Sequence, residues 1–177
     1  MSHGPISLAL ESSASLFTKI LHYTQSTNVP KGQSLHAHLI KTGSSSSCIY
    51  LCNSIVNFYA KCHRLVDAHL AFQEIQNKDV VSWNCLINGY AQLGRRDSSL
   101  SVLKLFKQMR QENALPNPHT LAGIFSAVST LGESFTGKQA HCLAFKLGYL
   151  SDVFVGSSLL NVYCKAGHHL DDARKVF

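Results

Sequence analysis

Cysteines are the side chains of this sequence most able to do chemistry. There are six, namely Cys48, Cys52, Cys62, Cys85, Cys142 and Cys164. No two form a CxxC pair, and no Cys₂His₂ spacing occurs, so a structural zinc site is not expected. Cys52, Cys85 and Cys164 fall on faces predicted to be buried in helices, where a free cysteine behaves as a small apolar side chain. We therefore expect reduced cysteines without metal.

Other catalytic constellations are missing from the 177 residues. The sequence has no phosphate-binding loop, no nucleophile elbow and no carboxylate pair in a predicted cleft. It predicts a protein that is not an enzyme and that needs no cofactor. The net charge of +6 favours a polyanionic partner, because each neutralised phosphate releases counterions.

The composition suits a folded, water-exposed chain rather than a membrane protein. Apolar residues make up 45% and charged residues 15%, which fits helices mostly covered by their neighbours. No run of 18 apolar residues occurs, so membrane insertion is not expected. The first residues, with no arginine and one glutamate, make a poor signal or transit peptide.

The strongest feature of the sequence is internal repetition. The run Gly32–Gly43 returns 105 residues later as Gly137–Gly148, and Asn53–Cys62 returns 104 residues later as Ser157–Ala166. A third variant, Asn84–Gly94, begins 31 residues after Asn53. A repeat of this length, with apolar residues at helical spacing, indicates a stacked helical array.

Each repeat reads as two amphipathic helices joined by a short polar turn. Residues 1–12 are expected to be a leader without fixed structure. The predicted units are residues 13–48, 49–79, 80–117, 118–152 and 153–177. About three extra residues in unit 80–117 should lengthen a turn or its second helix. The final unit is too short for a full second helix, so the chain is expected to stop inside a repeat.

Three polar residues stand just before predicted first helices. Asp79, Asn117 and Asp152 each occupy a place where a side-chain oxygen can accept hydrogen bonds from the first free backbone N–H groups. Helix capping is thus the simplest role for all three.

The residues also resemble a known family. DVVSWNCLINGYAQLG (Asp79–Gly94), followed by LKLFKQM and LPN, closely resembles a pentatricopeptide repeat. NSIVNFYAKC with LVDAHLAF resembles the short variant of that repeat, and GKQAHCLAFKLGYLSD the long variant. The order long, short, standard, long, short resembles the plant subfamily with mixed repeats, known as PLS.

This resemblance implies an all-α, right-handed α-solenoid that binds single-stranded RNA, one base per repeat. In the family, the fifth and last residues of a repeat read the base together. Asn53 with Asp79 would then favour uracil. Asn84 with Asn117 would favour cytosine and tolerate uracil, and Ser157 would suit a purine with a partner beyond the sequence.

Other positions match that scheme less well or play a different part. The pairs Ala122 with Asp152 and Phe17 with Cys48 supply no comparable amide. The second residues of the repeats are implied to flank the bases, although packing is an equal alternative for the aromatic ones. These residues are Tyr50, Val81, His119 and Phe154.

Two other functions remain open at this point. A tetratricopeptide-type scaffold that binds proteins also uses paired helices of this length. A zinc deaminase, which some family members carry, would need HxE and CxxC motifs, and the 177 residues contain neither. His36, His38 and His141 are expected to belong to second helices rather than to zinc. The resemblance implies a mitochondrial location, or alternatively a chloroplast one, with proteins of an RNA-editing complex as further partners.

Overall fold

The computed structural model describes residues 12–43, 48–132 and 134–165. Its helices come in pairs. The first helices of the pairs are α1 (Ser13–Gln25), α4 (Ile49–Lys61), α6 (Val80–Gln92), α8 (Pro118–Leu131) and α10 (Val153–Lys165). The second helices are α2 (Val29–Lys41), α5 (Leu65–Gln73), α7 (Arg96–Gln111) and α9 (Ser134–Lys146).

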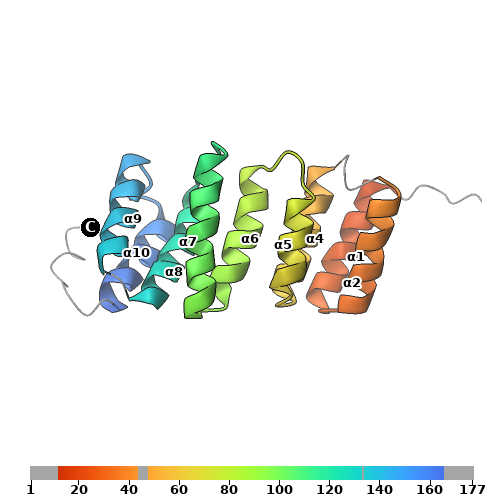
Figure 1. Ribbon diagram of the computed structural model, residues 1–177, viewed down its shortest axis with the longest axis horizontal. Coiled ribbons are helices and arrows are strands. Elements are labelled where there is room, and N and C mark those ends of the chain that lie inside the picture. Colours follow the sequence, from red (N-terminus) through yellow and green to blue (C-terminus); the bar gives the residue numbers. More distant parts are fainter. Residues whose placement is uncertain (1–11, 44–47, 133, 166–177) are drawn as a thin grey trace, which may run out of the picture.

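The helices stack in chain order along the long axis of the molecule (Figure 1). Neighbouring first helices pack directly on one another, in the row α1, α4, α6, α8, α10. Each second helix packs on its own first helix and on the first helix of the next pair. The described part of the chain contains no strand. The predicted all-α solenoid is confirmed, whereas the boundaries of the units stay a prediction.

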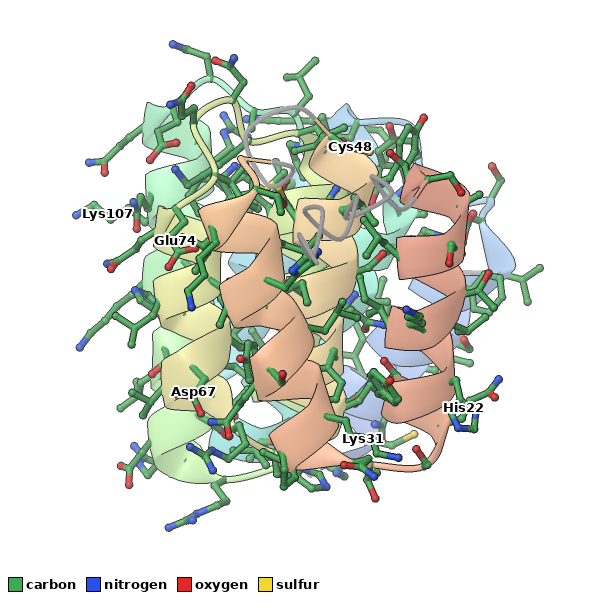
Figure 2. All side chains as sticks on the ribbon, turned by 90° about the vertical axis from the view of Figure 1, so that its right-hand side faces the viewer. His22, Lys31, Cys48, Asp67, Glu74 and Lys107 are labelled. Carbon is green, nitrogen blue, oxygen red and sulfur yellow. The ribbon has the colours of Figure 1, made fainter. Side chains whose placement is uncertain are left out.

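The two kinds of helix form two layers. Viewed along the stack, Glu74 and Lys107 of the α5 and α7 region lie on one side, and His22 of α1 lies on the other (Figure 2). The extra residues of unit 80–117 lengthen its second helix, since α7 has 16 residues and α5 has 9. The predicted second helix after α10 lies outside the described residues.

Large apolar side chains fill the space between the layers. Trp83, Phe58, Phe72 and Phe125 are fully buried. Phe72 and Trp83 meet edge to face with ring centroids 4.8 Å apart, so α5 of one pair is joined to α6 of the next. This shared core is continuous along the stack, and it fixes how each first helix sits against its neighbour.

Glycines allow the closest helix contacts. A Cβ built on Gly32 would lie 2.0 Å from the ring of Phe58, and one on Gly89 would lie 2.7 Å from Cβ of Ala60. Because a larger side chain cannot fit at either place, these glycines set the approach of α2 and α6 to α4.

Candidate nucleic-acid interface

Asn53 and Asp79 lie in contact across two neighbouring helix pairs. Asn53 projects from α4, and Asp79 is the N-cap of α6, where its Oδ1 accepts a 2.8 Å hydrogen bond from the backbone N–H of Ser82. Nδ2 of Asn53 donates to the same Oδ1 at 3.1 Å. The hydroxyl of Ser82 donates to Oδ1 of Asn53 at 2.7 Å. The three side chains therefore form one closed cluster.

An equivalent cluster occurs one unit further on. Asn117 caps α8, and its Oδ1 accepts from the backbone N–H of Thr120 at 3.1 Å. Nδ2 of Asn84 donates to Oδ1 of Asn117 at 3.0 Å, and the hydroxyl of Thr120 donates to Oδ1 of Asn84 at 2.7 Å. The family resemblance predicted that Asn53 pairs with Asp79 and Asn84 with Asn117. In the structure the two residues of each pair are in direct contact.

Capping decides which atom of each last residue is left for a ligand. The backbone N–H groups at the helix start need an oxygen, so Oδ1 of Asp79 and of Asn117 must face the helix. None of the bonds described above uses Oδ2 of Asp79 or Nδ2 of Asn117, and the carboxyl of Asp79 also receives a hydrogen bond from the backbone of Val81. The first cluster therefore has a carboxylate oxygen to offer, and the second has an amide donor.

The charge of Asp79 follows from its surroundings. Burial alone would raise the pKa of this carboxyl. Hydrogen bonds from the backbone and hydroxyl of Ser82 and from the amide of Asn53 favour the ionised form, and the net result is a pKa below the ordinary 3.8. Asp79 is therefore an acceptor at neutral pH.

A hollow open to solvent lies beside the second cluster. It has a volume of about 320 Å³ between α4, α6 and the start of α8, and Asn84 and Asn117 line it. Val81 and His119 stand at its edge and are exposed. Its other lining residues are mostly polar, and Lys61 adds a positive charge: they are Asn57, Ala60, Lys61, Cys85, Asn88, Gly89 and Gln92. Burial raises the pKa of the Cys85 thiol to about 11, so this cysteine is no nucleophile.

The predicted base-flanking residues lie at the surface. Tyr50 is 75% exposed and Phe154 is 65% exposed, so neither side chain is buried in the core. The rings of His119 and Phe154 have centroids 6.1 Å apart. Contact with bases stays a prediction for these residues and for the half-exposed Val81.

The remaining candidate positions form no such cluster. Asp152 caps α10 through bonds from Phe154 N and Val155 N to its Oδ1, at 2.9 and 3.1 Å. The residue at the place of Asn53 and Asn84 in the preceding unit is Ala122, which has no amide. Ser157 is exposed, and its hydroxyl donates to the Phe154 carbonyl at 3.2 Å.

Two second-helix histidines pair with tyrosines. Nδ1 of His36 lies 3.1 Å from the hydroxyl of Tyr59, and Nδ1 of His141 lies 2.7 Å from that of Tyr163. Among the described residues, no group of three potential ligands gathers. In the same residues, no helix is both long and apolar enough to cross a membrane.

Two outcomes differ from the sequence-based expectation. Cys164, expected to be buried, is exposed on α10, whereas its counterpart on α4, Ala60, is buried where α6 packs against it. Sequence reasoning also missed Ser82 and Thr120. The available signal was the pattern Asp/Asn-x-x-Ser/Thr, which is typical of reciprocal helix capping.

Comparison with known proteins agrees with this geometry. Residues 78–130 match a family model described as the PPR repeat family. The chain is 48% identical to the pentatricopeptide repeat-containing protein At2g33680 of Arabidopsis thaliana, over 93% of this chain and 22% of that protein. It is 39% identical to the putative pentatricopeptide repeat-containing protein At3g13770, mitochondrial, of the same plant, over 82% of this chain and 22% of the relative. The chain thus spans less than a quarter of these relatives.

A solved structure shows the same fold. The crystal structure of the pentatricopeptide repeat protein PPR10 in complex with an 18-nt psaJ RNA element matches with a TM-score of 0.51, over 94% of this chain and 29% of that one, at 14% identity. The stacked helix pairs make this chain a helical-repeat solenoid, in which α4, α6 and α8 are linked by polar contacts. With the sequence matches, they make this chain a pentatricopeptide repeat protein.

Proposed function

We propose that this chain binds single-stranded RNA in a sequence-specific way, reading one base per helix pair. The observation that carries the proposal is the pair of equivalent contacts, Asn53 with Asp79 and Asn84 with Asn117, on successive first helices. A groove for peptides would not require an amide and a cap residue to meet at the same place in each unit.

The two clusters favour different pyrimidines. Uracil carries an N3–H donor, which the ionised carboxylate of Asp79 accepts. Cytosine carries an N3 acceptor, to which the free Nδ2 of Asn117 donates. The same amide can donate to a uracil carbonyl, so tolerance of uracil is expected there. A purine at Ser157 belongs to the same proposal.

Flanking groups and charge support binding of a single strand. Exposed side chains at Tyr50, Val81, His119 and Phe154 offer faces on which bases can stack. The net charge of +6 and Lys61 in the hollow favour the phosphate backbone. At about 1–3 kcal/mol per stacked base, a few read bases reach about millimolar to micromolar affinity.

The setting we infer is organellar RNA processing or editing in a plant, with this chain as the specificity module of a PLS-type protein and editing-complex proteins as further partners. Several relatives carry the word mitochondrial in their names and another carries chloroplastic. On that basis we propose the mitochondrion, with the chloroplast as the alternative. A fluorescent fusion of the complete coding region, imaged in plant cells, distinguishes the two.

The central test is a set of RNA oligonucleotides that differ at one base. Fluorescence anisotropy at low salt should show that the 177-residue chain prefers U followed by C, or the reverse order if the strand runs the other way, over purines at the two central places. Equal affinity for all oligonucleotides would overturn base reading. Binding of peptides without binding of RNA would instead favour the tetratricopeptide-type scaffold.

A further inference from the structure

A hydroxyl group from the following helix completes each base-reading pair. Ser82 donates to Oδ1 of Asn53, and Thr120 donates to Oδ1 of Asn84, both at 2.7 Å. Both hydroxyl residues are fully buried, and the two asparagines are only 6% and 9% exposed. Water therefore has little access to replace these bonds.

The hydroxyl fixes which way the asparagine amide points. If the Asn84 amide were turned over, its Oδ1 would face Oδ1 of Asn117, and two acceptors would lie in contact. The hydroxyl of Thr120 supports the orientation that is present, because it donates to Oδ1 of Asn84 at 2.7 Å, the shorter of its two contacts; the other, to Oδ1 of Asn117, is 3.1 Å. Without that donor, the buried Oδ1 of Asn84 loses its hydrogen-bond partner, and the present orientation of the amide becomes less stable.

The cap itself does not need a hydroxyl at this place. Asp152 caps α10 with backbone bonds from Phe154 and Val155, and Val155 has no hydroxyl. The unit before that cap also has Ala122 at the place that Asn53 and Asn84 hold in the two preceding units.

In the two clusters the hydroxyl also takes part in the cap, since the backbone N–H of Asp79 donates to Ser82 at 3.2 Å and that of Asn117 donates to Thr120 at 3.0 Å. The cap of α10 shows that the oxygen of the cap residue can serve the helix start without it.

We propose that Ser82 and Thr120 are positioning residues for base recognition, so that each reading unit consists of three side chains rather than two. The hydroxyl holds the asparagine amide, the amide holds Oδ1 of the cap residue, and the cap residue then presents its remaining polar atom to the base. This inference rests on the proposed function, since it concerns how the proposed reader is held.

Thr120→Val is the sharpest test, because it removes the hydroxyl and keeps the branched shape. Thr120→Ser, which keeps the hydroxyl, is its matched control. Anisotropy titrations use the 177-residue chain and four RNAs that differ only at the base facing Asn84 and Asn117. Thr120→Val should reduce the preference for C over purines by about two- to tenfold, the worth of one hydrogen bond. Thr120→Ser should retain that preference.

The ratio of affinities separates positioning from folding. A merely less stable protein loses active molecules for all four RNAs alike, so its ratios stay constant; a thermal melt monitors the loss. Ser82→Ala, with Ser82→Thr as its control, repeats the test for uracil at Asn53 and Asp79. Unchanged ratios in Thr120→Val and Ser82→Ala would overturn this inference alone. A wild-type chain without base preference would overturn the proposed function and this inference with it.

Discussion

Nδ2 of Asn53 lies 3.1 Å from Oδ1 of Asp79, although 26 residues separate them in the sequence. Asp79 therefore does two things at once, since the same oxygen also caps α6. A change at Asp79 can alter the base that is read, the stability of the helix, or both, and the two effects must be measured separately.

Asp79→Asn should change the preferred base from U towards C. An asparagine at this place keeps an oxygen for the cap and turns the remaining atom from an acceptor into a donor. We expect the ratio of U to C affinity to fall about five- to tenfold, about one hydrogen bond's worth, while a thermal melt follows the change in stability separately. Asp152→Asn is the matched control, because the unit before that cap has Ala122 at the place of the asparagine, and the change should leave this ratio unaltered. If Asp79→Asn lowered the affinity for RNA equally for all four bases, Asp79 would serve only as a helix cap and would not contribute to base recognition.

The contribution of Asp79 to stability should vanish in acid. Its pKa is lower in the folded chain than in the unfolded one, because the bonds from Ser82 and Asn53 to the carboxylate outweigh burial. The stabilisation is therefore present above the unfolded value of 3.8 and is lost as pH falls through the lowered folded value. Urea denaturation of the wild type and of Asp79→Asn at pH 7 and near pH 3 measures this. The advantage of the wild type should shrink towards acid, and an advantage that grows would contradict the assignment.

Gly32→Ala should destabilise the stack. The new Cβ would lie 2.0 Å from the ring of Phe58, which is fully buried and has little room to turn. Overpacking of this kind costs about 1–3 kcal/mol, and the better helix propensity of alanine returns up to about 1 kcal/mol. Urea denaturation should show a net loss of free energy of unfolding. Ser34→Ala, at an exposed site on the same helix, is the control. A stabilised Gly32→Ala protein would mean that the ring of Phe58 moves aside without cost.

Lys61→Gln should weaken RNA binding without changing base preference. Lys61 is exposed at the end of α4 and lines the hollow, so its charge can reach a phosphate. Removing one phosphate contact should lower the slope of log affinity against log salt by about 0.7 for a single strand. Lys146→Gln on α9, in the other layer, is the control and should leave the slope unchanged. A loss confined to one base would argue that Lys61 touches the base itself.

The helical stack could be predicted from sequence because its signal is local and repeated. The spacing of residues such as Ile55, Val56 and Phe58 is that of a helix, and its return after about one unit predicts stacking. The caps at Asp79 and Asn117 were also readable, since they precede apolar periodic segments. The pairing of each cap with an asparagine on the preceding first helix came from family resemblance, because no local pattern links residues 26 or 33 apart.

The third member of each cluster needed the structure. Ser82 and Thr120 read in the sequence as ordinary first-turn residues, and only the packing of successive first helices brings their hydroxyls to the asparagines. The contacts of His36 with Tyr59 and of His141 with Tyr163 were missed for the same reason. The wrong expectation for Cys164 has another cause, because burial at this place depends on contact with a following first helix, as α6 gives to Ala60 on α4.

The row of first helices also limits the shape of any RNA that it reads. Packed helices lie about 8–10 Å apart, whereas bases stacked in a strand rise by about 3.4 Å each. If an RNA strand is read at one base per helix pair, its backbone must be extended and its bases must be unstacked. Side chains such as Val81 and His119 can then fill the gaps. A transcript folded into a hairpin would have to melt before it could lie on this surface, so the protein would compete with RNA folding and hold its target segment open.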